Sequence, residues 1–559
     1  MRTLRGIAAC PGAAVGPAYV YSPDTYEIPG SPIVDPEKAI VQLDEALDAV
    51  AAELHEAATD ATGESSDILK AQAVMARDPA LRAAAAEQIR AGKHPARAIL
   101  EAGETFARSL EGTGNEYLAA RAPDVLHICD VSARALADAP PRLPPHPIEP
   151  CVLVANDLSP ADTAGLDRGL TRAFVTEEGS ETSHTAVIAR SLGVPAVVGV
   201  RGLLAAIRAG EEIGVDGISG EVHVRPCEET IRHLQEAAEE VLRRRDRLRS
   251  AVGKGPTTTA DGLRIEVAAN IRSVEELRVA LAEGAEAVGL LRTELLYLDR
   301  TRPPSVAEQA NLLRQMHALL DGRRLVVRTF DIGADKLVPF LPVRLERNPE
   351  LGLRGLRLGR IHPDLLDVQL RAIAQVSSLG PTAVMAPMVS VVEDVIWFRD
   401  RVRAAGVPDS VEVGIMVEVP SAIFLAKELT RDVAFVSVGT NDLGQYIHAA
   451  DRRHPGLSAL RDPFSPALLR ALQLLCRSKR PECWVGVCGE AASNPAWALL
   501  AVGLGVTELS MEAFAISTVR AHLRRVTFER CREAAAEALR ATHPAEARAI
   551  GESLLEEET

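Results

Sequence analysis

Eight short apolar segments follow one another in the second half of the chain, and they limit the possible folds more than any other feature. The segments begin shortly after Gly253, and stretches with helical periodicity separate most of them. In order they read RIEVAAN, AVGLLRTE, RLVVRTFD, AVMAPMV, VGIMVEV, VAFVSVGTND, WVGVCGE and TELSM. Eight strand–helix units in about 250 residues are typical of a (β/α)8 barrel. The sequence therefore predicts such a barrel over residues 253–559.

Polar side chains collect at the ends of these apolar segments, where an ordinary core would leave them scattered. The residues at the segment ends are Asn270, Arg292, Arg328, Asp331, Glu418, Asn441, Asp442 and Cys488. In (β/α)8 barrels the carboxyl ends of all strands meet at one rim, and that rim carries the active site. We therefore predict a functional site built from these side chains.

Two carboxylates at the predicted rim suit a metal ion. Glu418 follows VGIMV and Asp442 follows VSVGTN, so consecutive strands would deliver both to the same rim. Two carboxylates, completed by substrate oxygens and water, form the sparse kind of site that Mg²⁺ usually occupies. Spacing alone leaves open that both residues only cap helices or pair with arginines.

Cationic side chains at the same rim indicate an anionic substrate. The candidates are Arg292, Arg328, Lys336, Arg354 and Arg452. Guanidinium groups bind phosphate and carboxylate through paired hydrogen bonds, so several on one rim favour a small, multiply charged anion. Lys336 and Arg354 could instead be solvated surface residues. Cys488 could deliver a proton to a carbanion, although a buried, inert thiol is the more common role of a cysteine.

The first half of the chain predicts an α/β domain that a helical bundle interrupts. Residues 1–24 have the small and β-branched composition of a strand–loop–strand unit, and short β-rich pieces return over residues 138–226. Residues 25–137 repeat apolar residues at helical spacing, with breaks at Asp78, Pro79 and Gly112, as expected for about four helices. We expect the N-terminal strands to join the later sheet, and residues 227–252 to form a charged linker helix.

The motif Thr182-Ser183-His184-Thr185 places a histidine where a helix is predicted to begin. Thr182 or Ser183 can cap a helix that ends at Gly193. Unpaired N–H groups and the positive end of the helix dipole favour an anion there, by roughly 0.3–1 kcal/mol from the dipole alone. A neutral imidazole nitrogen is also a competent nucleophile. His184 is therefore a candidate phosphoryl acceptor, the alternative being one more capping or surface histidine.

The composition limits the partners and the location. A chain of 559 residues exceeds what one core usually supports, and its net charge of −15 argues against nucleic acid and suits a basic protein partner. The N-terminus lacks the apolar core of a secretory signal, and no apolar run is long enough to span a bilayer. The eight cysteines form no C-x-x-C pair, which indicates reduced thiols. We therefore expect a cytoplasmic protein without membrane insertion.

Ordered motifs along nearly the whole chain resemble bacterial Enzyme I, the phosphoenolpyruvate-protein phosphotransferase of the sugar phosphotransferase system. They are GIAACPG, NEYLAARAPDV, TSHTAVIARSLGVPAVVG, GLLRTELLYLDR, VVRTFDIGADK, NPELGLRGLR, GIMVEVPSA, SVGTNDLGQY, AADRRH and VCGEAA. The resemblance implies transfer of the phosphoryl group of phosphoenolpyruvate to the histidine of TSH, His184, and from there to the phosphocarrier protein HPr. It also implies the release of pyruvate, as the first step of sugar transport.

The resemblance also assigns roles to the predicted rim. The substrate-binding residues of the family correspond here to Arg292, Arg328, Asn441, Asp442 and Arg452. Glu418 and Asp442 would hold Mg²⁺, and Cys488 would protonate the enolate. The family implies a homodimer through the barrel, with HPr docked on the helical insertion.

Other protein classes share some of these features. Pyruvate phosphate dikinase and phosphoenolpyruvate synthase share the histidine and barrel domains, but the helical residues 25–137 are too few for their ATP-binding domain. A nitrogen-regulatory paralogue would normally carry an extra N-terminal domain. An HPr-binding regulator without catalysis is the alternative from another class, and the intact candidate residues argue against it.

In the motif before His184, Glu181 stands where relatives usually carry an arginine.

Overall fold

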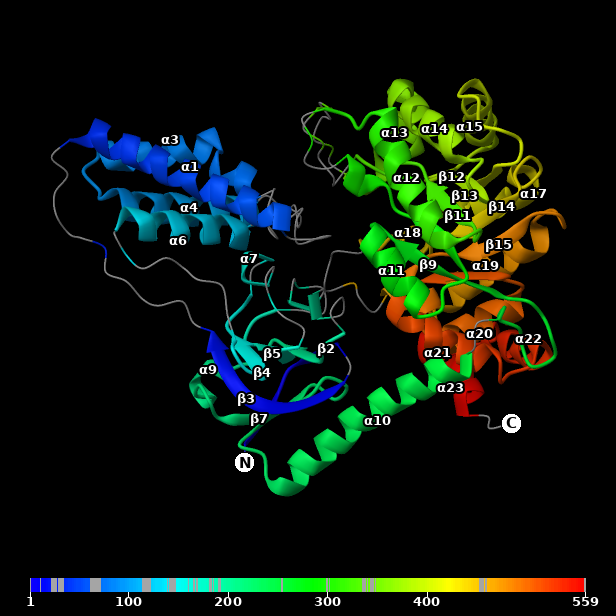
Figure 1. Ribbon diagram of the computed structural model, residues 1–559, viewed down its shortest axis with the longest axis horizontal. Helices are drawn as coiled ribbons and strands as arrows, with labels where there is room; N and C mark the ends of the chain where they lie inside the picture. Colours follow the sequence, from blue (N-terminus) through cyan, green and yellow to red (C-terminus); the bar gives the residue numbers. More distant parts are fainter. Residues whose placement is uncertain are drawn as a thin grey trace. The chain divides into compact units, whose positions relative to one another are not determined.

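The computed structural model forms two compact units, Met1–Arg244 and Arg245–Thr559 (Figure 1). It describes residues 2–556 except for residues 11, 22–27, 29–34, 61–71, 113–121, 138, 140–146, 159, 164–165, 167–168, 180–182, 184, 187, 190–192, 253–254, 298–299, 301, 334–337, 339, 342–345, 347, 452–456 and 458–459. Among the described residues, no helix is both long and apolar enough to cross a membrane.

The first unit contains an eight-stranded sheet with the strand order β1-β8-β7-β3-β4-β5-β6-β2. The strands are β1 (Arg2–Arg5), β2 (Ile7–Cys10), β3 (Ala13–Tyr21), β4 (Cys151–Ala155), β5 (Thr171–Thr176), β6 (Ala196–Val198), β7 (Glu212–Asp216) and β8 (Glu221–Val224). Strands β3 to β6 run parallel, and the other pairs are antiparallel. The N-terminal strands therefore join the sheet of the later strands, as predicted. Two short helices, α7 (Pro160–Thr163) and α9 (Leu203–Ala206), belong to the same region.

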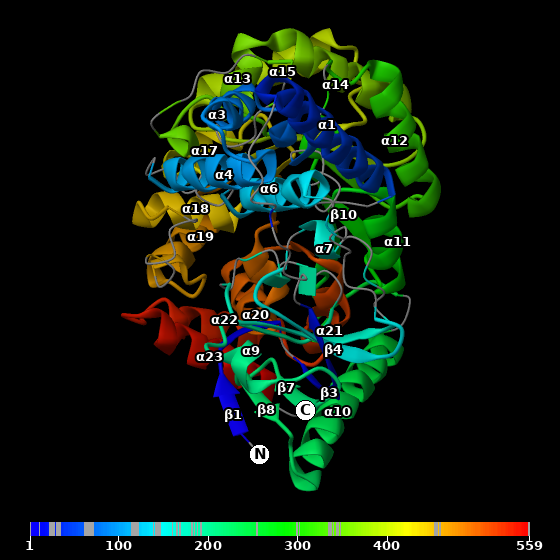
Figure 2. The same ribbon diagram turned by 90° about the vertical axis from the view of Figure 1, so that its left-hand side faces the viewer.

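Four helices of the described residues lie between β3 and β4 in the sequence. They are α1 (Pro36–Asp60), α3 (Pro79–Arg90), α4 (Pro95–Gly112) and α6 (Ala122–Leu136). The helices pack side by side (Figures 1 and 2) around a core that includes Leu43, Leu47 and Ile99. Asp78 caps α3 by accepting a hydrogen bond from the Ala80 N–H, and α4 ends at Gly112. The breaks predicted from the sequence are thus helix ends.

A long charged helix, α10 (Glu228–Val252), begins in the first unit and continues into the second. Glu228 and Glu229 occupy its first turn, where negative charge interacts favourably with the helix dipole. The helix extends over the segment for which the sequence predicts a charged helix.

The second unit is a closed barrel of eight parallel strands. The strands are β9 (Glu266–Ile271), β10 (Ala287–Leu291), β11 (Leu325–Arg328), β12 (Thr382–Ala386), β13 (Glu412–Val417), β14 (Phe435–Val438), β15 (Trp484–Val487) and β16 (Glu508–Met511). Each of the eight apolar segments overlaps one of these strands, so the predicted barrel is confirmed. Both faces of the strands are buried, which explains why the segments read as almost continuous apolar runs.

Helices surround the barrel strands (Figure 1). They are α11 (Val274–Ala282), α12 (Val306–Leu320), α13 (Leu356–Ile361), α14 (Pro363–Val376), α15 (Val392–Ala404), α16 (Pro420–Phe424), α17 (Ala426–Leu429), α18 (Thr440–His448), α19 (Pro466–Ser478), α20 (Pro495–Leu504), α21 (Ala513–Leu523), α22 (Phe528–Ala538) and α23 (Pro544–Glu556). Side chains alternate along the strands: Val436 and Val438 pack in the core shared with the helices, whereas Phe435 points into a second core inside the barrel.

The amino end of the barrel is closed by charged and aromatic side chains. Arg324 pairs there with Glu266 and Glu508, and its guanidinium carbon lies 4.2 Å from the centre of the Trp484 ring. Trp484 in turn stacks on Phe435, with ring centres 4.4 Å apart. The pKa of Glu508 is raised to about 8 because burial and the neighbouring Glu266 carboxylate together outweigh the lowering effect of Arg324.

The segment that leads from α10 into the barrel is held by Arg520 of α21. Its guanidinium donates hydrogen bonds to Thr257 Oγ1 (2.8 Å) and to the carbonyl oxygens of Gly255 (2.7 Å) and Gly284 (2.6 Å). The same group lies 3.2 Å from Glu286 and is almost completely buried. Arg520 therefore connects the segment that enters the barrel, at Gly255 and Thr257, with the loop that precedes β10.

Candidate active site

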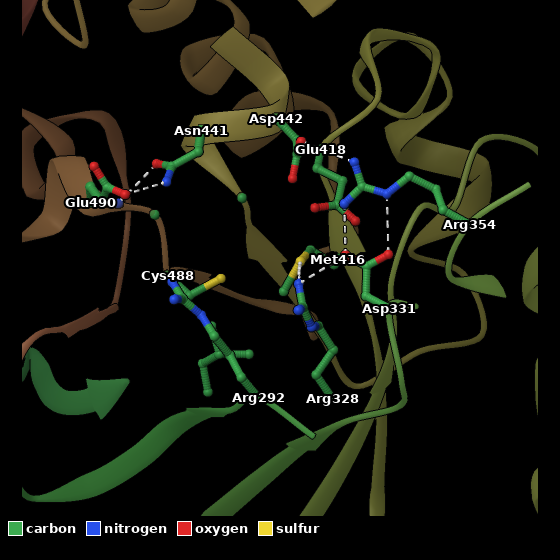
Figure 3. A pocket seen from close by; sticks show the side chains of 13 residues that line it. Arg292, Arg328, Asp331, Arg354, Met416, Glu418, Asn441, Asp442, Cys488 and Glu490 are labelled. Atoms are coloured by element: carbon green, nitrogen blue, oxygen red, sulfur yellow. Dashed lines mark hydrogen bonds and ion pairs between the residues drawn. The ribbon is translucent and has the colours of Figure 1, made fainter. Parts of the chain in front are cut away.

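A pocket of about 190 Å³ lies at the carboxyl ends of the barrel strands. The loops that follow β10, β11, β13, β14 and β15 supply most of its wall (Figure 3). The lining residues are Leu290, Arg292, Arg328, Asp331, Arg354, Met416, Glu418, Gly439, Asn441, Asp442, Cys488, Gly489 and Glu490. The pocket is thus at the rim where the sequence predicts a site.

Arg328 is the last residue of β11 and is held between two carboxylates. Its guanidinium donates a 2.9 Å hydrogen bond to Glu294 and lies 3.5 Å from Asp331. Burial lowers the pKa of the Arg328 guanidinium, but the carboxylates of Glu294 and Asp331 outweigh this effect and raise the pKa above its ordinary value. Arg328 is therefore a fixed positive charge at the base of the pocket.

Arg354 holds several carboxylates of the pocket together (Figure 3). It donates hydrogen bonds of 3.2 and 2.8 Å to Asp331, pairs with Glu350, and reaches Asp442 at 3.3 Å. Its position depends on a close backbone approach to Gly333, which pairs with Arg354 in an isolated β-bridge. A Cβ atom at Gly333 would lie 2.2 Å from the Leu353 carbonyl oxygen, and the φ angle of +116° also requires glycine.

Glu418 and Asp442 follow neighbouring strands and face the same pocket. Glu418 comes directly after β13, is 1% exposed, and accepts a 2.6 Å hydrogen bond from the Met388 N–H. Asp442 lies in the first turn of α18. The pKa of Glu418 is raised to about 8, first by burial and then by the charges of Asp442 and Asp331, against the lowering effect of Arg328 and Arg354. This part of the pocket holds more negative charge than its arginines neutralise, so it favours a bound cation.

Asn441 and Glu490 form a reciprocal pair at the mouth of the pocket. The Asn441 amide donates a 3.0 Å hydrogen bond to Glu490 Oε1, and Asn441 Oδ1 accepts a 3.0 Å hydrogen bond from the Glu490 N–H. The pair fixes the amide orientation between α18 and the loop after β15. Arg292, which follows β10, lines the same pocket and forms no ion pair with a described residue.

Cys488 follows β15 and is 2% exposed. Its N–H donates a 3.0 Å hydrogen bond to the Val438 carbonyl oxygen, and its own carbonyl oxygen accepts one from Asn270 at 3.1 Å. Burial raises the pKa of the thiol to about 11, so the thiol is protonated at neutral pH. A buried, protonated thiol beside two arginines can deliver a proton to a carbanion formed in the pocket.

The structure brings most of the predicted site residues into one pocket. These are Arg292, Arg328, Glu418, Asn441, Asp442 and Cys488. His184, Arg452 and Lys336 lie outside the described residues. Arg354, which the sequence leaves undecided, lines the pocket, whereas Asn270 lies beneath it and supports the backbone of Cys488.

Some residues of the site were not predicted. Glu294 and Glu350 fix the arginines Arg328 and Arg354, and Met416 lines the pocket from within β13. All three residues lie in motifs that resemble Enzyme I, but a motif does not show which carboxylate pairs with which arginine.

Three descriptions of known protein families match the chain. The PEP-binding domain of PEP-utilising enzymes matches residues 246–528, which contain the whole pocket. The mobile domain of these enzymes matches residues 147–220, and their N-terminal region matches residues 5–121.

Similar proteins match nearly end to end. The chain is 42% identical to a phosphoenolpyruvate-protein phosphotransferase of Streptomyces coelicolor, over 99% of both chains. The chain belongs to the phosphoenolpyruvate-protein phosphotransferase family. Another phosphoenolpyruvate-protein phosphotransferase, from Listeria monocytogenes, is 36% identical over 96% of both chains. A multiphosphoryl transfer protein of Xanthomonas campestris is 37% identical over 98% of this chain and 66% of that protein. These matches confirm the resemblance to Enzyme I, and the pocket described above lies in the region that matches the family's PEP-binding domain.

Proposed function

We propose that the barrel pocket binds phosphoenolpyruvate with Mg²⁺ and that the phosphoryl group passes to His184 and then to the phosphocarrier protein HPr. One observation carries the proposal: a single pocket combines three arginines, two neighbouring carboxylates and a buried thiol. Phosphoenolpyruvate carries a phosphate and a carboxylate on three carbons, and both groups are recognised by guanidinium groups. Its small size is compatible with a pocket of about 190 Å³.

Arg292 and Arg328 are the proposed contacts to the substrate oxygens, together with Asn441. Arg328 is held rigidly by Glu294 and Asp331, so it can meet the substrate without reorganising. Arg292 forms no ion pair with a described residue and is available to an anion. Arg452, outside the described residues, is the third proposed arginine.

Glu418 and Asp442 are the proposed ligands of Mg²⁺. Burial and the charges of Asp442 and Asp331 raise the pKa of Glu418, and a divalent cation would stabilise its ionised form. Among the described residues, no group of three or more metal-ligating side chains gathers, so substrate oxygens and water would complete the coordination. When bound, Mg²⁺ would supply positive charge that offsets the negative charge developing on the substrate oxygens.

The transfer breaks the bond between phosphorus and the bridging oxygen of phosphoenolpyruvate. The electron pair of that bond stays with the oxygen, and an enolate remains in the pocket while an imidazole nitrogen of His184 takes the phosphoryl group. Arg292 and Arg328 stabilise the spreading negative charge. The Cys488 thiol then gives its proton to carbon 3 of the enolate, and pyruvate forms.

The domain roles and partners belong to the same proposal. Residues 1–24 and 138–226 would form the phosphohistidine domain, residues 25–137 the HPr-binding helices, residues 227–252 the linker helix, and residues 253–559 the substrate-binding barrel. His184 and the barrel lie in different units of the chain, so transfer requires a movement between them, with α10 as the connecting element. A homodimer through the barrel, a cytoplasmic location and a role in sugar transport complete the proposal.

Labelling with radioactive phosphoenolpyruvate tests the proposal. The wild-type chain with Mg²⁺ is expected to take up acid-labile label and to pass it to added HPr. His184→Ala should take up no label, yet it should bind phosphoenolpyruvate with nearly unchanged affinity in calorimetry, because binding belongs to the barrel.

Two controls accompany the labelling experiment, one for the metal ion and one for the choice of histidine. Addition of EDTA should abolish labelling of the wild type, and a matched substitution of another histidine in the first unit, His223→Ala, should leave it intact. Label that persists in His184→Ala would contradict the proposal, as would a wild-type chain that binds phosphoenolpyruvate but takes up no label.

A further inference from the structure

The hydroxyl group of Ser437 lies inside the barrel beside Cys488. Ser437 is in β14, and its backbone pairs with Gly486 of β15, two residues before Cys488. Residues of β14 at alternate positions, such as Phe435, point into the barrel interior, and Ser437 shares that face. Ser437 is 1% exposed, so no solvent reaches its hydroxyl group.

The Ser437 hydroxyl has few hydrogen-bonding groups around it. Its Oγ atom forms no hydrogen bond with a described group. Ser437 and Cys488 lie on neighbouring strands at the inner face of the barrel. Burial raises the pKa of the Cys488 thiol, and the Ser437 hydroxyl opposes that effect. A buried hydroxyl without a partner costs about 1–3 kcal/mol in mutational studies of proteins. The Ser437 hydroxyl therefore does not stabilise the barrel, and this makes Ser437 a candidate for a functional role.

The surroundings of the thiol explain what the hydroxyl can do. The inner core around Cys488 is apolar and includes Met385, Met416 and Phe435. Two neighbouring polar groups do not donate to the Cys488 sulfur: the Val438 carbonyl oxygen, 3.7 Å from Sγ, is an acceptor, and Asn270 donates to the backbone carbonyl. Arg292 and Arg328 act on the thiol through their positive charge. When the thiol loses its proton, the sulfur becomes an anion in this apolar core. The Ser437 O–H is the uncharged donor that faces it.

We propose that Ser437 is a positioning residue for Cys488, whose hydroxyl group donates a hydrogen bond to Sγ while the thiol proton passes to the substrate. The inference rests on the proposed function. In the step, the S–H bond breaks and its electron pair stays on sulfur, while the electron pair of the enolate forms the new C–H bond at carbon 3. Water returns a proton to the sulfur before the next turnover. Ser437 keeps its own proton throughout and stabilises the thiolate.

The test compares two buried serines of the same barrel in the full-length chain. Ser437→Ala removes the donor at the thiol, whereas Ser510→Ala removes a serine that donates to Asn270 at 2.7 Å and reaches only the backbone of Cys488 through it. Pyruvate release is measured with phosphoenolpyruvate, Mg²⁺ and HPr, in H₂O and in D₂O. Ser437→Ala is expected to lower kcat about tenfold or more, the size expected for a hydrogen bond to a charged group, with little change in KM.

The solvent isotope effect separates a role in proton transfer from a role in packing. It should increase in Ser437→Ala, because the proton step becomes slower than phosphoryl transfer, and it should stay at the wild-type value in Ser510→Ala. Ser437→Cys under reducing conditions keeps a weak donor of similar shape and should fall between wild type and the alanine variant. If Ser437→Ala does not fold, Ser437→Cys alone decides the question.

The outcomes distinguish the inference from the proposed function. A wild-type chain that forms no pyruvate and takes up no label overturns the proposed function itself. A fully active wild type, with unchanged kcat and isotope effect in the Ser437 variants, overturns only the role of Ser437. A loss confined to KM does the same, since it shows that the hydroxyl group shapes the pocket and has no part in proton transfer.

Discussion

The guanidinium group of Arg354 lies 3.3 Å from the carboxylate of Asp442, one of the two proposed ligands of Mg²⁺. The same group binds Asp331 and Glu350 and is 3% exposed. Burial lowers the pKa of Arg354, but the carboxylates of Asp331 and Asp442 outweigh this effect and raise it. Arg354 therefore offsets part of the negative charge of Asp442.

Arg354→Gln should make the chain depend more strongly on Mg²⁺. The substitution breaks the buried ion pairs of Arg354 with Asp331 and Asp442, and loss of one partner of a buried pair costs about 3–5 kcal/mol of folding free energy in comparable cases. Mg²⁺ can replace part of the lost positive charge, so thermal unfolding should show a larger rise of Tm with Mg²⁺ for the variant than for the wild type. Arg360→Gln, on α13 and paired with Asp394, is the control. An equal response of both variants would contradict the prediction.

Cys488→Ser should slow the formation of pyruvate more than it weakens substrate binding. A serine hydroxyl is a much weaker acid than a thiol, so the proton step should slow by at least about tenfold, at the low end of the range for general acid catalysis. Coupled measurement of pyruvate gives kcat, and calorimetry gives the affinity for phosphoenolpyruvate. Cys483→Ser, at another buried cysteine of the barrel, serves as the control. Losses confined to KM would mean that Cys488 only positions the substrate.

Glu508→Gln should remove a pH dependence of barrel stability. Because the pKa of Glu508 is raised to about 8 from 4.5, the folded state binds the extra proton between these values. The resulting stabilisation is fully present below pH 4.5 and is lost as the pH rises towards 8, at up to about 1.4 kcal/mol per pH unit for one group.

Urea unfolding of the barrel between pH 5 and 8 checks this slope, which should be smaller in the variant than in the wild type. Glu412→Gln removes a carboxylate with a 43% exposed side chain from the same end of the barrel and is the control for the loss of a negative charge there. Identical slopes for the wild type and Glu508→Gln would show that Glu508 is ionised in the fold.

Arg520→Met should destabilise the barrel by about 3–5 kcal/mol, because it removes a buried cation that pairs with Glu286. The hydrogen bonds to Thr257 and to two backbone carbonyls are lost with it. Arg524→Met is the matched control, since Arg524 donates to the same segment from a less buried position and should matter by less than about 1 kcal/mol. Thermal or urea unfolding measures both, and similar losses in the two variants would contradict a special role of Arg520.

The barrel could be predicted from the sequence because its strands are buried on both faces. An unbroken apolar run such as WVGV is typical of a strand that is buried on both faces. Eight such runs in order, separated by helices, are typical of a (β/α)8 barrel. The ends of the runs also located the pocket, since parallel strands bring their carboxyl ends together. The helix ends at Asp78 and Gly112 followed from ordinary capping and breaking signals.

Several pairings inside the pocket could not be predicted, because they join residues that are distant in sequence. Glu294 holds Arg328 from a loop 34 residues earlier, and Arg354 meets Asp442 across a separation of 88 residues. Nothing in the local pattern distinguishes these carboxylates from surface ones. Ser437 gave no signal either, since one small polar residue within FVSV does not interrupt a buried strand.

Strands β3 and β4 are hydrogen-bonded neighbours, with Tyr21 opposite Ala155, although residues 22–150 separate them in the sequence. A parallel pair of this kind needs a crossover of only a dozen or more residues. Recombination within a genome can therefore exchange the whole intervening segment and leave every strand pairing of the sheet in place. If the inserted helices select the acceptor protein, the acceptor can change in evolution while the α/β domain keeps its fold.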